Sequence, residues 1–186
     1  METSGLTPRP GSMHAITYSY GESSLGSFLA AIDEEGVCAV LGDDRDELRC
    51  DLQAKFPDRN LEIAAHMGFG DTIIDAVASL IEQPASVPVF AMSIRAGDFE
   101  QMLYAALRQT KPGTTVTPAE IAVMIGGAPG SAPFVRAHAS RDHLAVVVPF
   151  HRLQELDGTS PAYRWGEERR AALLKREAAW PVLIAG

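Results

Sequence analysis

The sequence predicts an α+β protein in which a small strand-containing unit precedes a mostly helical unit. Apolar and polar residues alternate near the start of the chain, whereas apolar residues at helical spacing dominate later segments. The 186 residues suffice for one large domain or two small ones. We therefore expect a first domain over residues 13–92 and a second over 93–186. Residues 1–12 are rich in Gly, Pro, Ser and Thr and are predicted to be a disordered leader.

Three strands are expected near the start of the first domain. Alternation predicts them over His14–Tyr20, Leu25–Ile32 and Gly36–Leu41. Turn-forming residues at Gly21–Ser24 and Asp33–Glu35 separate these strands. Because each connection is short, the strands should form an antiparallel meander.

Two helices and a further strand should complete the first domain. Asp46–Phe56 places leucines at helical spacing, and Pro57 ends the helix. Asp71–Glu82 places apolar residues on one helical face. The short apolar run Val87–Ala91 predicts a last strand.

The second domain should be mostly helical. Asp98–Gln109 has a clear apolar stripe, and Thr117–Met124 begins with Thr-Pro-Ala-Glu, a capping box with proline at the first helical position. Ser131 is expected to cap a helix that runs to about Ser140 and tolerates Pro133 in its first turn.

The rest of this domain combines one buried segment, one turn and a last helix. Leu144–Val148 should be a buried strand-like segment, Asp157-Gly158 a tight turn, and Glu167–Ala179 the closing helix. A helix, a glycine-rich turn and a second helix at 117–140 indicate a helix-turn-helix. Two packed helices without a role in DNA binding fit this pattern equally well.

Composition narrows the class of function. The net charge of −8 argues against a general nucleic-acid binder, but it is unevenly distributed. Residues 94–186 hold 11 Lys/Arg and 9 Asp/Glu, so the acidity lies in the first half. No apolar run approaches the roughly 18 residues that a membrane span requires, so no membrane contact is expected. Two cysteines fit a reducing cytoplasm, and no Cys/His spacing predicts a metal or cofactor.

Collinear segments along the chain resemble the O6-alkylguanine-DNA alkyltransferase family. Pro149-Phe150-His151-Arg152 follows the apolar run 144–148 at the place where that family reads Pro-Cys-His-Arg. Further matching stretches are 36–44, 95–108, 117–126, 157–159, 163–166 and 173–178. The resemblance implies a small ribonuclease-H-like α/β unit followed by a mostly helical, winged helix-turn-helix DNA-binding domain.

In that family a cysteine takes the alkyl group from a flipped base after a histidine and a glutamate activate it. The resemblance puts Phe150 at the nucleophile position, and a phenyl ring has no lone pair with which to attack carbon. It implies that His151 and Glu177 are remnants of the activating pair, and that Phe150, His151, Arg152 and Tyr163 line the substrate pocket. The same residues could equally form a buried polar network that fixes the last helix, with Tyr163 filling core.

The DNA-binding residues of the family also have matching positions here. Its nucleotide-rotating tyrosine falls on Pro118, its intercalating arginine on Pro133 and its supporting asparagine on Asp142. Arg136, one turn beyond Pro133, is a candidate replacement for that arginine. The expected contacts to the minor groove are Arg136, Ala137, Ser140, Arg141, Pro118 and Pro133.

We therefore predict a protein that is not an enzyme and that senses O6-alkylguanine in double-stranded DNA without alkyl transfer. It would act as a monomer and pass lesions to nucleotide excision repair proteins. A second hypothesis is a regulatory or protein-interaction module with weak or no DNA binding. A third is an active alkyltransferase whose cysteine was deliberately exchanged. Cys38 and Cys50 are poor substitutes for the nucleophile because both lie in the other unit.

Overall fold

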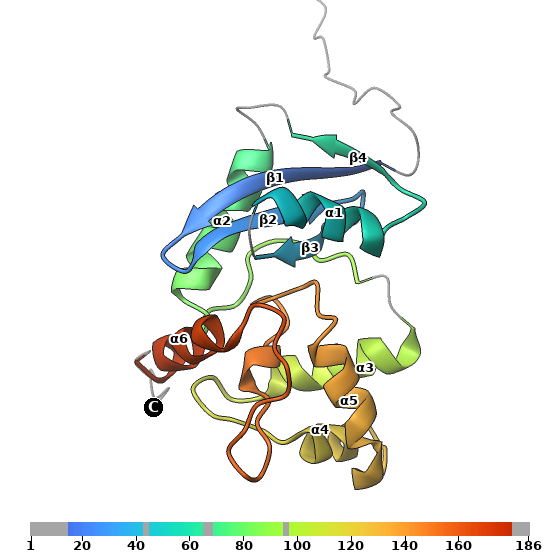
Figure 1. The fold of residues 1–186 in the computed structure, drawn as a ribbon, viewed down its shortest axis with the longest axis vertical. Coiled ribbons are helices and arrows are strands. Elements are labelled where there is room, and N and C mark those ends of the chain that lie inside the picture. Colours follow the sequence, from blue (N-terminus) through green and yellow to red (C-terminus); the bar gives the residue numbers. More distant parts are fainter. Residues whose placement is uncertain (1–14, 43–44, 65–68, 95–96, 180–186) are drawn as a thin grey trace, which may run out of the picture.

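The computed structural model describes residues 15–42, 45–64, 69–94 and 97–179. The predicted leader, 1–12, lies outside these ranges. A strand-rich unit lies at one end of the molecule and a helical unit at the other, with the last helix, α6 (Glu167–Ala179), beside their junction (Figure 1). This arrangement confirms the predicted α+β class. The division at residue 92 stays a prediction, since one hydrophobic cluster contains residues from both units.

The first unit is built on a four-stranded sheet of order β3-β2-β1-β4. The strands β1 (Ala15–Ser23), β2 (Gly26–Ile32) and β3 (Val37–Leu41) pair antiparallel, which confirms the predicted meander. The short strand β4 (Asn60–Ile63) pairs parallel with β1. The sequence analysis did not predict β4, because its alternation of polar and apolar residues extends over only four positions, three of which are exposed.

Each face of the sheet carries a helix, as the alternation of β2 requires. Leu29 and Ala31 point to the cluster that contains Leu48 and Leu52 of α1 (Arg45–Lys55). Their neighbours on β2 join the larger cluster beneath α2 (Phe69–Glu82). Figure 1 shows these two helices on opposite sides of the sheet.

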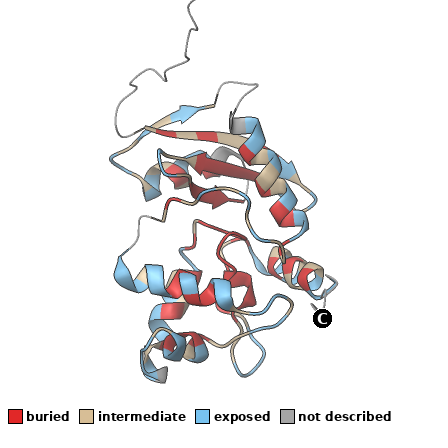
Figure 2. Ribbon diagram, turned by 180° about the vertical axis from the view of Figure 1, so that it is seen from behind, coloured by how far each residue is buried: buried red, intermediate tan, exposed pale blue. Residues whose placement is uncertain are grey.

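The second unit contains α3 (Asp98–Gln109), α4 (Pro118–Met124) and α5 (Ala132–Ala139), whose bounds agree with prediction. A short 3-10 turn, η1 (Pro129–Ser131), precedes α5, and another, η2 (Phe150–Arg152), follows it. Helices α4 and α5 pack against each other, and α3 packs against α4. Buried residues gather where these helices meet the segment around η2, whereas the outer faces of α3 and α5 are mostly exposed (Figure 2).

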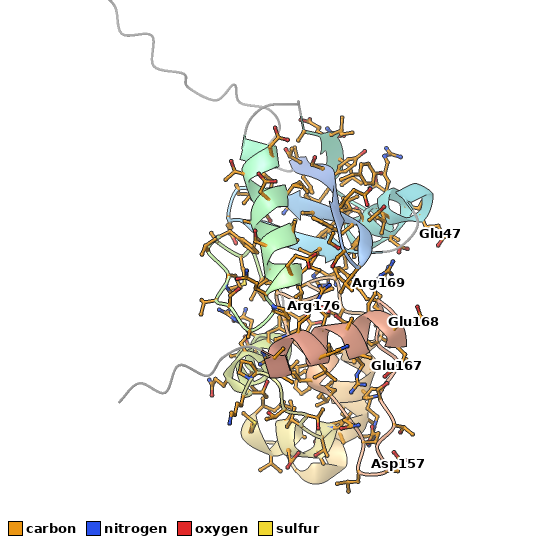
Figure 3. The ribbon with its side chains drawn as sticks, turned by 90° about the vertical axis from the view of Figure 1, so that its left-hand side faces the viewer. Glu47, Asp157, Glu167, Glu168, Arg169 and Arg176 are labelled. Atoms are coloured by element: carbon orange, nitrogen blue, oxygen red, sulfur yellow. The ribbon has the colours of Figure 1, made fainter. Side chains whose placement is uncertain are left out.

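Helix α6 contacts both units. Figure 3 shows Arg169 and Arg176 on the side of α6 that faces the sheet. Arg169 Nε donates to the carbonyl of Leu25 at 2.9 Å, and Arg176 donates to the carbonyl of Ile81 at 2.7 Å. The helix therefore provides hydrogen-bond donors to carbonyl groups in the β1–β2 turn and near the end of α2. It also contacts η2 of the second unit.

Several local predictions were wrong. Gly21 lies within β1 and not in a turn, because the Phe28 ring packs over it and a Cβ there would come within 2.3 Å of the ring. The segment 87–91 is not a strand: Pro88 cannot donate to a ladder, and Val87 and Val89 are 79% and 88% exposed. Ser131 stands at the N-cap position of α5, but its side chain makes no capping hydrogen bond.

The segment Leu144–Val148 is buried as predicted, and Leu144 forms an isolated parallel bridge with Val40 of β3, but the residues after it make a tight turn and not a continuous strand. The amide of Val148 donates to the carbonyl of Leu144 at 2.8 Å, so the chain folds back on itself. Val146 at the turn has φ +62°, a left-handed conformation that strains a β-branched residue.

Candidate nucleic-acid interface and the buried site beside it

The tetrapeptide Pro149–Arg152 contains η2 and its N-cap residue, Pro149, and the carbonyl of Arg152 accepts the amide of Val116 just before α4. Phe150 is 1% exposed, and its ring meets Tyr104 of α3 edge-to-face with centroids 5.9 Å apart. Such pairs add to the stabilisation that burial alone gives. The ring of Phe150 is therefore a core element that joins η2 to α3.

His151, Arg152 and Glu177 form a closed buried network. His151 Nε2 lies 2.8 Å from Glu177 Oε1, and Arg152 contacts both oxygens of the same carboxylate. Glu177 Oε2 also accepts the amide of Gly113 at 2.9 Å. One carboxylate thus receives donors from η2 and from the loop after α3.

The charges in this network are set by burial and by these hydrogen bonds. Burial alone would raise the pKa of Glu177, but hydrogen bonds from His151 and Arg152 outweigh it and hold the pKa at about 2. Burial lowers the pKa of His151, against the opposing effect of Glu177. An ionised carboxylate only accepts, so the Nε2 atom of the neutral imidazole must carry the proton. The other ring atom, Nδ1, is buried and makes no hydrogen bond in the described part of the chain.

Arg152 has a second set of partners that makes its role structural. Its NH1 atom donates to the Thr110 carbonyl at 2.6 Å and to the Thr110 hydroxyl at 2.9 Å. These bonds satisfy the C-terminal end of α3. A cavity of about 200 Å³ lies beside the same guanidinium, bounded by Arg108, Pro149 and the strained Val146 among others.

Asp142 lies 2% exposed at the start of this buried segment. Its Oδ1 accepts the amide of Leu144 at 2.9 Å, whereas Oδ2 has no hydrogen-bond partner among the described residues. Burial raises the pKa of Asp142 to about 7, since it disfavours the charged form. Tyr163 is also buried, and burial together with the charge of Asp142 raises its pKa.

The helix-turn-helix itself has one well-capped helix and one open face. The Thr117 hydroxyl accepts from the Glu120 amide at 3.1 Å, and the Glu120 carboxylate accepts the Thr117 amide at 2.7 Å, which confirms the predicted capping box. Pro118 is buried against the fold and does not lie on the exposed face. The predicted contacts Pro133 and Ala137 of α5, and Ser140 and Arg141 directly after it, are exposed.

Arg136, the predicted replacement for the intercalating arginine, already has a partner in the fold. Its Nε bonds to Glu155 Oε1, and its NH2 donates to Oε2 of the same carboxylate at 2.8 Å. This hydrogen bonding raises the pKa of Arg136 and lowers that of Glu155. The sequence analysis missed Glu155, because nothing in the sequence pairs residues 19 positions apart.

The structure brings together most of the predicted pocket residues. The rings of His151 and Tyr163 meet with centroids 6.3 Å apart, next to Phe150 and Arg152. Cys38 lies buried in β3 and Cys50 exposed on α1, both in the first unit as expected. Within the described ranges no cluster of three or more candidate metal ligands occurs, and no helix is long and apolar enough to cross a membrane.

The second unit thus combines a capped helix-turn-helix with a buried His–Glu–Arg network. Residues 98–179 match the family model of the 6-O-methylguanine DNA methyltransferase DNA-binding domain. Over these residues the chain is similar to the alkylguanine-DNA alkyltransferases.

Curated relatives extend this likeness over both units. The chain is 35% identical over 184 residues, 95% of its length, to the bifunctional transcriptional activator/DNA repair enzyme Ada of Escherichia coli. It spans about half of that relative, 51%. It is 36% identical over 86 residues to a methylated-DNA–protein-cysteine methyltransferase of Mycobacterium tuberculosis, covering 46% of this chain and 52% of the relative.

Solved structures share the fold. The O6-methylguanine methyltransferase of Mycobacterium tuberculosis aligns over 90% of this chain and 96% of its own, with TM-score 0.70 and 22% identity. The same organism's OGT in complex with DNA aligns over 88% of this chain and 93% of its own, with TM-score 0.69 and 22% identity.

These comparisons correct one prediction. The expectation that the protein is not an enzyme is contradicted, because the relatives are named as methyltransferases and a DNA repair enzyme. The expectation rested on a single aligned position, residue 150, and on the assumption that chemistry depends on that position alone. That Phe150 stands at the position of the nucleophile stays a prediction from alignment.

Proposed function

We propose that this protein binds double-stranded DNA through the exposed face of α5 and recognises O6-alkylguanine in alkylation-damage repair. The observation that carries the proposal is the match of residues 98–179 to the family's DNA-binding domain. The open face of α5, described above, lies within that match.

Charge and relatives support the same proposal. The second half of the chain has a small excess of basic residues, although the whole chain has a net charge of −8. Phosphate contacts by Lys and Arg supply most non-specific DNA affinity, so a locally basic unit can bind where the average charge would not. A relative of the same fold was solved in complex with DNA, and Ada is named a DNA repair enzyme.

The small side chains on α5 fit a groove-facing surface. Ala137 and Ser140 let a DNA backbone approach the helix closely, and Arg141 supplies a positive charge at its end. Extruding a base costs a few kcal/mol. Pro118 is buried, and Arg136 is engaged by Glu155 in the free protein, so contacts elsewhere on this face must offset part of that cost in the complex.

Fluorescence titration of two labelled duplexes tests the proposal. One duplex carries a single O6-methylguanine and the other carries guanine at that position. Tighter binding to the damaged duplex is the expected result, whereas equal binding would reduce the function to non-specific association. No binding at low salt would overturn the proposal.

A matched pair of variants locates the surface. Arg141→Ala should weaken DNA binding several-fold and lower the salt slope by about one. Arg49→Ala removes an exposed arginine from α1 in the other unit and should leave affinity unchanged. Intact-mass measurement after incubation with the damaged duplex determines whether a methyl group is transferred to the protein, and peptide mapping locates the acceptor.

A second candidate function is regulation through protein contacts. Its supporting observation is that Pro118 and Arg136, at or near the family's two base-flipping positions, are both engaged within the fold. Two relatives are named as a transcriptional activator and a regulatory protein. This candidate would be favoured if the intact chain binds no duplex and if a protein partner binds it in the absence of DNA. Monomeric state, cytoplasmic location and nucleotide excision repair partners stay predictions.

A further inference from the structure

The ion pair between Arg136 and Glu155 occupies the guanidinium of an arginine on the proposed DNA-binding face. Arg136 lies on α5, one turn after Pro133 and one turn before Ser140, so these residues share a face. Both nitrogens of Arg136 that point toward the loop are bonded to Glu155. A bidentate carboxylate pair has the same geometry with which arginine binds phosphate.

Glu155 is held in place by its backbone, so the pair is not a chance meeting of two long side chains. The Glu155 amide donates to the Thr159 carbonyl at 2.7 Å, and the Gly158 amide donates to the Glu155 carbonyl at 3.0 Å. The preceding residue, Gln154, donates its amide to the carbonyl of Val116 at 3.0 Å, next to the N-terminus of α4. The turn therefore presents one carboxylate to α5 from a fixed position.

We propose that Glu155 acts as an internal substitute for a DNA phosphate and competes with the DNA backbone for Arg136. In the free protein the carboxylate occupies the guanidinium. On DNA a phosphate takes its place, and Arg136 becomes a contact of the bound state. This inference rests on the proposed DNA-binding function, and it assigns to Glu155 a lowering of the affinity for DNA.

The exposure of the pair makes the exchange feasible. The side chains are 42% and 24% exposed for Arg136 and Glu155, so water screens the pair and replaces its bonds as it opens. Exposed pairs of this kind contribute little to stability. The restraint on DNA binding should therefore be modest, about two- to fivefold in affinity.

The decisive experiment measures affinity for an undamaged duplex at low salt in the full chain. Glu155→Gln keeps the side-chain shape and removes the charge, and it should raise affinity about two- to fivefold. Asp157→Asn is the matched control, because it removes one negative charge from the same turn, does not contact Arg136, and retains an oxygen to accept from Thr159. It should raise affinity clearly less.

A second variant separates the pair from general electrostatics. In the double variant Arg136→Ala/Glu155→Gln the gain in DNA affinity should disappear, because the guanidinium that Glu155→Gln would release is absent. An equal gain from Asp157→Asn, or a gain that persists without Arg136, would overturn the inference.

The lesion-selectivity titration keeps the two proposals apart. If the wild-type protein prefers the damaged duplex but Glu155→Gln has wild-type affinity, only the competition by Glu155 fails. If the wild type binds no duplex but Glu155→Gln does, the proposed function fails and the competition stands. If neither protein binds, both are overturned.

Discussion

The Nε2 atom of His151 lies 2.8 Å from Oε1 of Glu177, and both side chains are fully buried. The two residues are 26 positions apart, on η2 and α6. Because Glu177 also binds Arg152 and the amide of Gly113, its carboxylate connects α6 to the turn that carries Phe150. This one acidic side chain thus fixes the position of the buried site behind the proposed DNA-binding face.

Replacing Glu177 by Gln should therefore destabilise the protein strongly. The change leaves the buried Arg152 without its counter-charge, and breaking a buried pair in this way costs about 3–5 kcal/mol. Urea unfolding at neutral pH measures the loss. Glu168→Gln is the matched control, because Glu168 is exposed on the same helix, and it should change the free energy of unfolding by at most about 1 kcal/mol. Equal losses for both variants would contradict the network's role.

Stability should fall as pH rises from 3.8 to about 7 because of Asp142. Its pKa in the folded state is about 7 and its ordinary value is 3.8, so the folded protein holds this proton more tightly than the unfolded chain does. The resulting stabilisation is fully present at low pH and disappears as pH rises through 7. Between these two pKa values the free energy of unfolding should fall by up to about 1.4 kcal/mol per pH unit, and well above pH 7 the contribution of Asp142 to the slope vanishes.

Asp142→Asn isolates this effect. The amide keeps an oxygen that can accept from Leu144 but has no charge to bury. Urea unfolding of both proteins at pH 6 and pH 8.5 should show the variant losing less stability across the interval. Parallel pH profiles would show that Asp142 does not carry the dependence.

The strain at Val146 predicts an unequal response of two neighbouring valines. Val146 and Val147 are both buried, so replacing either by Gly loses a similar apolar contact. Only Val146 has φ +62°, and glycine adopts that conformation without strain. Val146→Gly should therefore be less destabilising than Val147→Gly by about 1–2 kcal/mol, measured by thermal or urea unfolding. A larger loss at Val146 would contradict a strained backbone at this residue.

The capping box of α4 predicts a local cost. Thr117→Ala removes the hydroxyl that accepts from Glu120, and such losses cost about 0.5–2 kcal/mol. Thr115→Ala is the control, since Thr115 is exposed and outside the helix. Hydrogen exchange should show that the amides at the start of α4 lose protection in the first variant and keep it in the second.

How far the sequence predicted the site depends on the distance over which each signal acts. The capping box was predicted because it depends on residues within about one helical turn, whereas the Pro-Phe-His-Arg turn and the DNA-facing end of α5 were predicted from the resemblance to a family. The pairing of Glu155 with Arg136 was not, since it requires the turn 155–159 to fold beside α5. The strain at Val146 was also hidden, because an apolar run is equally consistent with a buried strand and a buried turn.

By itself the sequence determined the meander, the helices and the capping box of α4, because hydrophobic period and capping chemistry act locally and need no distant partner. Tertiary structure alone decided that β4 joins the sheet, that Pro118 turns inward, that Asp142 retains its proton near neutral pH and that Arg136 is engaged. Each of these depends on which distant groups exclude water from a side chain or supply its hydrogen bonds, and only the packed fold sets that environment.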